Sequence, residues 1–231
     1  MFRNIAVFFI FVLNIISFTA GADGISLSKS RIIFNAGSKS QTVVLYNDSK
    51  SPFLVQASVG ESPEGKASDK FIVTPPLFRI NAGAEYTVRI MPNDFSSLPA
   101  DRESMFFFKA RAIPPASSSK NDDNKADLVF ITSIVIKLHY RPELLAELDN
   151  AIFRRINMTE KNNKWYLENP TPYYLTVIDL TINGETQSGS IILPPEDKIL
   201  IRSNQPVRTA EWRIINDYGG TTDKFSFPGA L

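Results

Sequence analysis

Short β-forming runs follow one another along this chain, with no long amphipathic helical segment between them. The runs are rich in Val, Ile, Tyr, Phe and Thr, and clusters of Pro, Gly, Asn and Ser separate them. They cover residues 41–46, 53–59, 86–91, 105–113, 164–167, 173–182, 190–193 and 209–215. Such spacing is typical of antiparallel β-sandwiches, and the pair Asn183-Gly184 after one run predicts a hairpin.

A break in the β pattern falls near Arg141-Pro142. A long run ends there, and the segment ELLAELDN follows before the β pattern resumes. We therefore predict an all-β protein with two sandwich domains, one over residues 23–141 and one over residues 142–231. The polar stretch 116–127 is expected to be a solvated loop.

The first 22 residues do not fit this pattern. Residues 5–18 form an apolar run, and Ala20-Gly21-Ala22 follows with the small residues of a cleavage site. The run is short for a transmembrane helix, which needs about 20 apolar residues. We predict a cleavable secretory signal peptide over residues 1–22, with an N-terminal membrane anchor as the alternative.

Composition excludes several functional classes. The chain has no cysteine, one histidine, and 25 basic against 24 acidic residues. Without thiols it can form neither disulfides nor cysteine-ligated metal sites, and its small net charge offers no electrostatic basis for binding nucleic acid. We expect no catalytic residue, no metal and no cofactor, and we expect an exported fold that its own core stabilises.

Residues 128–140, LVFITSIVIKLHY, predict an unusually long strand. Both alternating sets of side chains are apolar through its first half. A strand with two apolar faces is normally covered on both sides. The strand is therefore either buried between two sheets of its own domain, or it keeps an apolar face and an edge available for an added strand. The pattern alone leaves both readings open.

Seven segments give the chain a family resemblance. In order they are SRIIF (30–34), VTPPLFRI (73–80), LPADRES (98–104), AIPP (112–115), KLHYRP (137–142), ENPTPYY (168–174) and INDYGG (215–220). With these segments the chain resembles the periplasmic chaperones of the chaperone–usher pilus-assembly pathway. Each segment alone is a weak signal, whereas seven in order behind a signal peptide are a strong one.

The resemblance implies two immunoglobulin-like β-sandwiches arranged as an L, with a cleft between them. It implies binding rather than catalysis, and a location in the periplasm. A pilin subunit lacks one strand of its sandwich. The chaperone lends its own long strand to complete the subunit, which is donor-strand complementation, and then delivers the subunit to the outer-membrane usher.

The resemblance also implies roles for particular residues. Arg31 and Lys137 match the two basic cleft residues that hold the C-terminal carboxylate of the subunit. The side chains expected to fill the subunit groove are Leu128, Phe130, Thr132 and Ile134. Thr132 departs from the large apolar residue usual there. Because Lys137 has the opposite parity to the groove-filling set, we expect a β-bulge between them. The alternative for these residues is ordinary core packing and solvated surface charge.

Glu103, Arg141 and Asp217 match a family set that implies a salt-bridge network between the domains, the alternative being unrelated surface charges. His139 stands where the family often has an aromatic residue, and we assign it no role.

Two other functions remain as alternatives. A two-domain adhesin or structural subunit shares the fold class but does not need Arg31 and Lys137 to converge. A secreted hydrolase would need a nucleophile beside His139, and no motif such as G-x-S-x-G lies near it. The length of the 116–127 loop and the absence of cysteine favour the short-loop subfamily of chaperones. The apolar segment 128–136 also allows a homodimer as a further partner arrangement, in which each copy of the chain covers the donor strand of the other.

Overall fold

The structure is a computed structural model that describes residues 24–115, 130–203 and 205–228. This part of the chain is almost wholly β, and its helical content is the four-residue α2 (Asn150–Phe153). No helix in it is long and apolar enough to cross a membrane. The predicted signal peptide, residues 1–22, lies outside the described residues.

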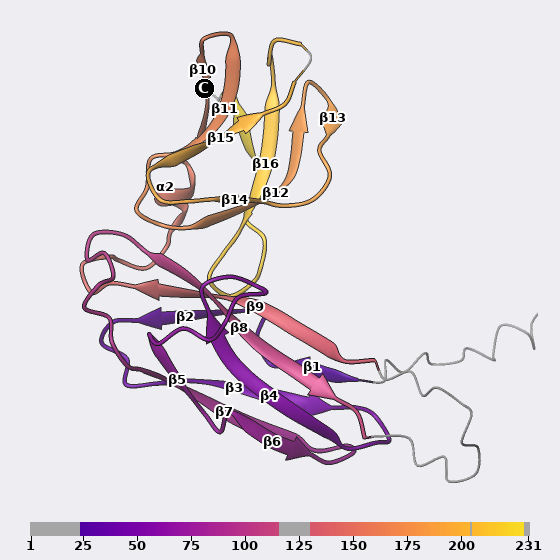
Figure 1. Cartoon of the computed structure of the whole chain (residues 1–231). Helices are drawn as coiled ribbons and strands as arrows, with labels where there is room; N and C mark the ends of the chain where they lie inside the picture. The colour runs from indigo at the N-terminus through magenta and orange to yellow at the C-terminus, as the bar shows by residue number, and fades with distance from the viewer. Residues whose placement is uncertain (1–23, 116–129, 204, 229–231) are drawn as a thin grey trace, which may run out of the picture.

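Two lobes follow one another along the chain, and each encloses its own cluster of buried apolar side chains. Figure 1 shows the second lobe at an angle on one end of the first. The predicted all-β fold with two sandwiches is confirmed.

The first lobe packs two sheets face to face. One sheet has the order β1 (Ile25–Leu27), β3 (Gln41–Asn47), β7 (Glu85–Pro92) and β5 (Phe71–Thr74). The other has the order β2 (Arg31–Asn35), β9 (Thr132–Arg141), β8 (Ser104–Ile113), β4 (Phe53–Gly60) and β6 (Leu77–Ile80). Alternate side chains point inward, and Phe71 packs edge-to-face against Phe34 and Phe106, with ring centroids 5.4 and 5.0 Å apart.

The second lobe repeats this plan with shorter strands. One sheet has the order β10 (Asn157–Lys161), β11 (Lys164–Asn169) and β15 (Asp197–Ile201). The other has the order β13 (Glu185–Thr186), β12 (Leu175–Ile182), β16 (Ala210–Ile215) and β17 (Phe225–Phe227), with β14 (Ile191–Leu193) also paired to β12. The expected hairpin joins β12 to β13 through Asn183 and Gly184, both with positive φ.

The long strand differs from the expectation in two ways. β9 begins at Thr132 rather than at residue 128. Its antiparallel register with β8 then runs without a shift from Thr132 to Tyr140. The expected bulge is therefore absent from this stretch, since a bulge would put two residues opposite one and shift the register. As a result, Lys137 lies on the opposite face of β9 from Thr132 and Ile134.

Candidate functional site

The site begins with the parallel pairing of β2 and β9. In this register Arg31 lies directly opposite Lys137. Leu138 and Tyr140 are buried in the core of the first lobe. Because side chains alternate along a strand, Lys137 points to the outer face of the sheet. The register therefore brings together two cations that are far apart in the sequence.

Each of these cations donates a hydrogen bond to the second lobe. Arg31 Nη1 donates to the backbone carbonyl oxygen of Ile215 at 3.3 Å, and Lys137 Nζ donates to Thr176 Oγ1 at 3.0 Å. Thr176 and Ile215 are themselves opposite one another in the β12–β16 pairing. The ends of two paired strands of the second lobe thus hold both side chains.

The electrostatic environment of the pair favours an anion. Within the described residues, neither cation forms a salt bridge. Burial lowers the pKa of Lys137, and the nearby charge of Arg31 lowers it further. Burial also lowers the pKa of Arg31, although Asp217 and Glu103 partly oppose this effect. A carboxylate placed between the two groups would relieve their repulsion and complete their hydrogen bonding.

The second cluster joins the lobes through Arg141, the last residue of β9. Its Nη1 and Nη2 donate to the two carboxylate oxygens of Asp217 at 2.7 and 3.0 Å. Its Nε donates to Glu103 Oε1 at 2.8 Å. The guanidinium carbon also lies 5.3 Å from the centre of the Tyr173 ring. Glu103 comes from the first lobe and Asp217 from the second, so one buried guanidinium bridges both.

Glu103 makes further contacts with the second lobe. Its Oε2 accepts a hydrogen bond from the backbone N–H of Tyr174 at 2.9 Å, and its own N–H donates to the carbonyl oxygen of Pro172 at 2.9 Å. Burial raises the pKa of Glu103, and the charge of Arg141, its hydrogen bond to Glu103 and the hydrogen bond from the Tyr174 N–H partly counter this. Burial disfavours the Arg141 charge as well, but its two acidic partners outweigh this and raise its pKa. These directional contacts therefore join Arg141 and Glu103 to residues of the second lobe.

His139 lies between the two clusters. Its side chain is 3% exposed, and neither ring nitrogen has a hydrogen-bond partner among the described residues. The Nδ1 atom is 3.7 Å from Glu103 Oε2. Burial lowers the pKa of His139 to about 3, and the charges of Arg31, Lys137 and Arg141 add to this effect. The histidine is therefore neutral at ordinary pH.

The residues expected to fill the subunit groove differ in how far they are exposed. Phe130 is 74% exposed and Thr132 is exposed, whereas Ile134 is half-buried. Leu128 lies outside the described residues. On the other face, Ile131 and Val135 are 43% and 37% exposed. Sequence reasoning did not single out these last two, although the alternation of the strand placed them together on the outer face.

One edge of β9 is open beside these side chains. β8 pairs with β9 from Thr132 to Tyr140, whereas β2 pairs with it only from Lys137 onward. No other described strand pairs with the β2-side edge over residues 132–136. The backbone there is available to another strand, and the open edge ends at Arg31 and Lys137.

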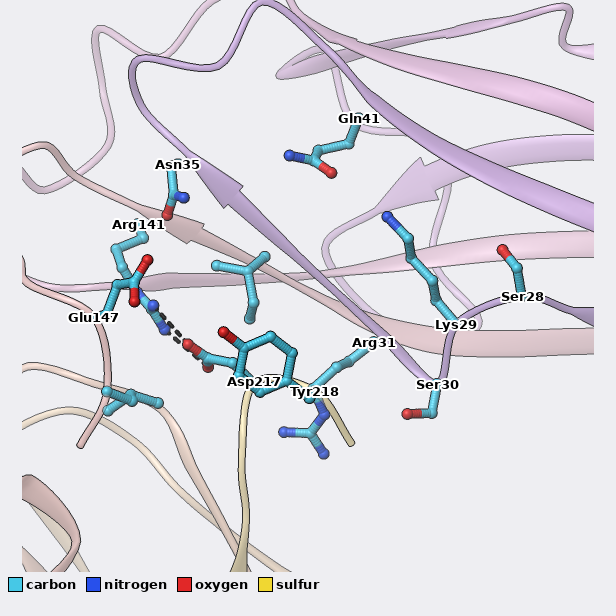
Figure 2. A pocket seen from close by; sticks show the side chains of 12 residues that line it. Ser28, Lys29, Ser30, Arg31, Asn35, Gln41, Arg141, Glu147, Asp217 and Tyr218 are labelled. Atoms are coloured by element: carbon cyan, nitrogen blue, oxygen red, sulfur yellow. Dashed lines mark hydrogen bonds and ion pairs between the residues drawn. The ribbon is translucent and has the colours of Figure 1, made fainter. Parts of the chain in front are cut away.

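A cavity of about 530 Å³ lies next to the site, between β2 and the turn after β16. Figure 2 shows Arg31 and Asp217 among its lining residues, with dashed lines joining Asp217 to Arg141. Tyr218 also lines it and is exposed. The contacts of the Ile215 carbonyl and the Thr176 hydroxyl could not be predicted from the sequence, because each depends on the meeting of the two lobes.

Comparison with known proteins places this arrangement in a family. Residues 24–146 match the family described as "Pili and flagellar-assembly chaperone, PapD N-terminal domain". Residues 151–226 match "Pili assembly chaperone PapD, C-terminal domain". The chain therefore belongs to the PapD-like pilus-assembly chaperones. Members of this family are chaperones rather than enzymes, which confirms the prediction of a non-enzymatic protein.

Relatives over most of the chain agree with this assignment. The chaperone protein FimC of Escherichia coli K12 is 36% identical over 204 residues, covering 88% of this chain and 83% of FimC. The chaperone protein PapD of Escherichia coli is 36% identical over 215 residues, covering 87% and 85%.

Solved structures agree as well. The periplasmic chaperone SfaE has a TM-score of 0.72 at 31% identity, covering 88% of this chain and 98% of SfaE. A Salmonella enterica complex of the SafA pilin with the SafB chaperone contains a chain with a TM-score of 0.77 at 28% identity, covering 89% of this chain and 96% of that one. The family relationship places this protein in the periplasm.

Proposed function

We propose that this protein binds pilin subunits by donor-strand complementation and delivers them to the outer-membrane usher. The observation that carries the proposal is the open edge of β9 over residues 132–136, which ends at two cations without a carboxylate partner among the described residues. The family relationship supports it, as does the solved complex of the SafA pilin with the SafB chaperone.

The pairing of β2 suggests how a subunit strand would be oriented. β2 runs parallel to β9 and begins pairing at Arg31. A subunit strand added to the open edge in the same direction would end where β2 begins. Its terminal carboxylate would then lie near Arg31 and Lys137 and accept charge-assisted hydrogen bonds from both. Those bonds would fix the register of the added strand.

The groove-filling side chains supply apolar contact in this proposal. Thr132 and Ile134 lie on one face of β9, and Leu128 and Phe130 share their parity in the sequence. Full burial of an exposed Phe contributes roughly 1.5–3 kcal/mol, and Phe130 is largely exposed before the subunit arrives. Thr132 would contribute less because a hydroxyl replaces part of the apolar surface. The opposite parity of Lys137 is compatible with its role, because it would meet the end of the subunit strand rather than the groove.

The remaining parts of the chain serve this activity. We infer that residues 1–22 are a cleavable signal peptide, that residues 23–141 form the domain that donates the strand, and that residues 142–231 form the second wall of the cleft. Glu103, Arg141 and Asp217 hold the two domains at a fixed angle. Before a subunit binds, a second copy of the chain could occupy the open edge, which would give a self-capped homodimer.

Periplasmic co-expression with a candidate pilin subunit tests the proposal. We expect a 1:1 complex that Arg31→Ala or Lys137→Ala abolishes while the protein stays folded. Lys39→Ala is the matched control, because Lys39 is exposed and belongs to the first lobe. Stable subunit capture by both cleft variants would refute the carboxylate site. A purified chain that binds a surface ligand without a subunit would instead favour an adhesin.

A further inference from the structure

A braced turn in the second lobe contacts the start of β2. This turn, residues 216–220, follows β16 directly. Asn216 Oδ1 accepts hydrogen bonds from the backbone N–H groups of Tyr218 and Gly220 at 3.1 and 2.9 Å. The backbone N–H of Asn216 donates to the Gly220 carbonyl oxygen at 2.8 Å, and that of Gly219 donates to the Asn216 carbonyl oxygen at 3.0 Å. These bonds hold the shape of the turn.

Gly219 lies at the point of contact with the first lobe. A Cβ atom at this position would overlap the hydroxyl oxygen of Ser30 and would lie 3.5 Å from the Ser30 Cβ atom. Gly219 also has a φ of +83°, which side-chain-bearing residues rarely adopt. A side chain at 219 would therefore require the Ser30 hydroxyl to rotate away or the turn to shift from the first lobe.

The contact is next to the Arg31 guanidinium. Ser30 precedes Arg31 in the chain, and Ile215, which accepts the hydrogen bond from Arg31, precedes the turn. That hydrogen bond is 3.3 Å long, near the upper limit for an N–H donor. A displacement of the turn by a few tenths of an ångström would break it and free the guanidinium.

We propose that Gly219 is a positioning residue for Arg31. The absence of a side chain at 219 lets the 216–220 turn pack against Ser30, and this packing keeps the Ile215 carbonyl oxygen within reach of the guanidinium. The inference rests on the proposed function, in which Arg31 binds the terminal carboxylate of the subunit. Gly219 itself touches no part of the subunit and acts through Arg31.

The chain offers a matched control for backbone strain. Gly189 has a φ of +88°, and a Cβ atom there would meet nothing within 4 Å. A substitution at 189 therefore strains the second lobe much as one at 219 does, without disturbing the contact with Ser30. Ser30→Ala adds a second control, because it removes the oxygen that a side chain at 219 would overlap.

The assay measures the carboxylate contact alone. A synthetic peptide copying the C-terminal strand of the co-expressed pilin is prepared as the free acid and as the C-terminal amide, and both affinities are measured by calorimetry. The ratio of the two affinities reports binding of the carboxylate. For the wild type we expect the acid to bind at least about tenfold more tightly than the amide, because one charge-assisted hydrogen bond already contributes roughly that factor and the carboxylate would accept from two cations. General loss of stability would not change this ratio.

We expect Gly219→Leu to reduce the acid-to-amide ratio several-fold, with the remainder supplied by Lys137, and Gly189→Leu to keep the wild-type ratio. If Gly219→Leu does not fold, Gly219→Ala replaces it; its ratio should fall, and Ser30→Ala in the same chain should restore it. A wild-type ratio in the folded 219 variant overturns the inference and leaves the proposed function intact. A wild type that binds acid and amide equally refutes the carboxylate site itself.

Discussion

Replacing Asp217 by asparagine should weaken the contact between the lobes by about 2 kcal/mol. Asp217 accepts two hydrogen bonds from Arg141, at 2.7 and 3.0 Å, and the Arg141 side chain is only 4% exposed. Removing one partner of a buried ion pair typically costs about 3–5 kcal/mol. The expected cost is smaller here because Arg141 keeps Glu103 at 2.7 Å, and because asparagine keeps one acceptor oxygen.

Urea unfolding followed by tryptophan fluorescence measures this cost. Both tryptophans of the chain, Trp165 and Trp212, belong to the second lobe and report its unfolding. Glu211→Gln is the matched control, since Glu211 forms a 2.9 Å ion pair with Lys224 in the same lobe and both side chains are about half exposed. An exposed pair of this kind contributes about 0.2–1 kcal/mol.

The expected result is a clearly larger fall in the free energy of unfolding for Asp217→Asn than for Glu211→Gln. Equal falls would refute the reasoning, because they would mean that the contact between the lobes adds no stability to the second lobe. If Asp217→Asn unfolds with wild-type stability but captures less subunit, the network of Glu103, Arg141 and Asp217 sets the angle of the cleft without stabilising the second lobe.

Two further predictions concern β9 and the two residues that precede it. His139→Phe should leave stability at pH 7 unchanged or raised, because two unpartnered nitrogens are removed. A pKa of about 3 for His139 in the folded state lies below the unfolded value, so the wild type should lose about 2 kcal/mol between pH 7 and pH 5 that the variant keeps; equal pH profiles in urea titrations would contradict this. Phe130→Asp should abolish subunit capture in co-purification while Ile131→Asp only weakens it; the reverse order would assign groove filling to the outer face.

The β class and the two-lobe plan could be predicted from the sequence because they depend on local patterns. Alternating apolar residues define strands, and turn residues define where strands end. The same reasoning found the hairpin at Asn183-Gly184. The same reasoning was wrong about where β9 begins and about a bulge within residues 132–140. Apolar residues on both faces of a segment do not show where its pairing with neighbouring strands begins. The start at Thr132 depends on β8, which is distant in the sequence.

From the sequence alone we could predict the two basic residues of the cleft, the three charges of the network between the lobes, and the apolar segment ahead of Lys137. Which of these residues lie in contact depends on the folded structure. The parallel register set Arg31 beside Lys137, and the meeting of the lobes gave those cations the Ile215 carbonyl and the Thr176 hydroxyl as partners. Packing in the folded protein also buries the neutral ring of His139 near the charged side chains of Arg31, Lys137 and Arg141. The physical reason is that propensity and alternation are local, whereas register, burial and contacts between lobes join residues that the sequence keeps far apart.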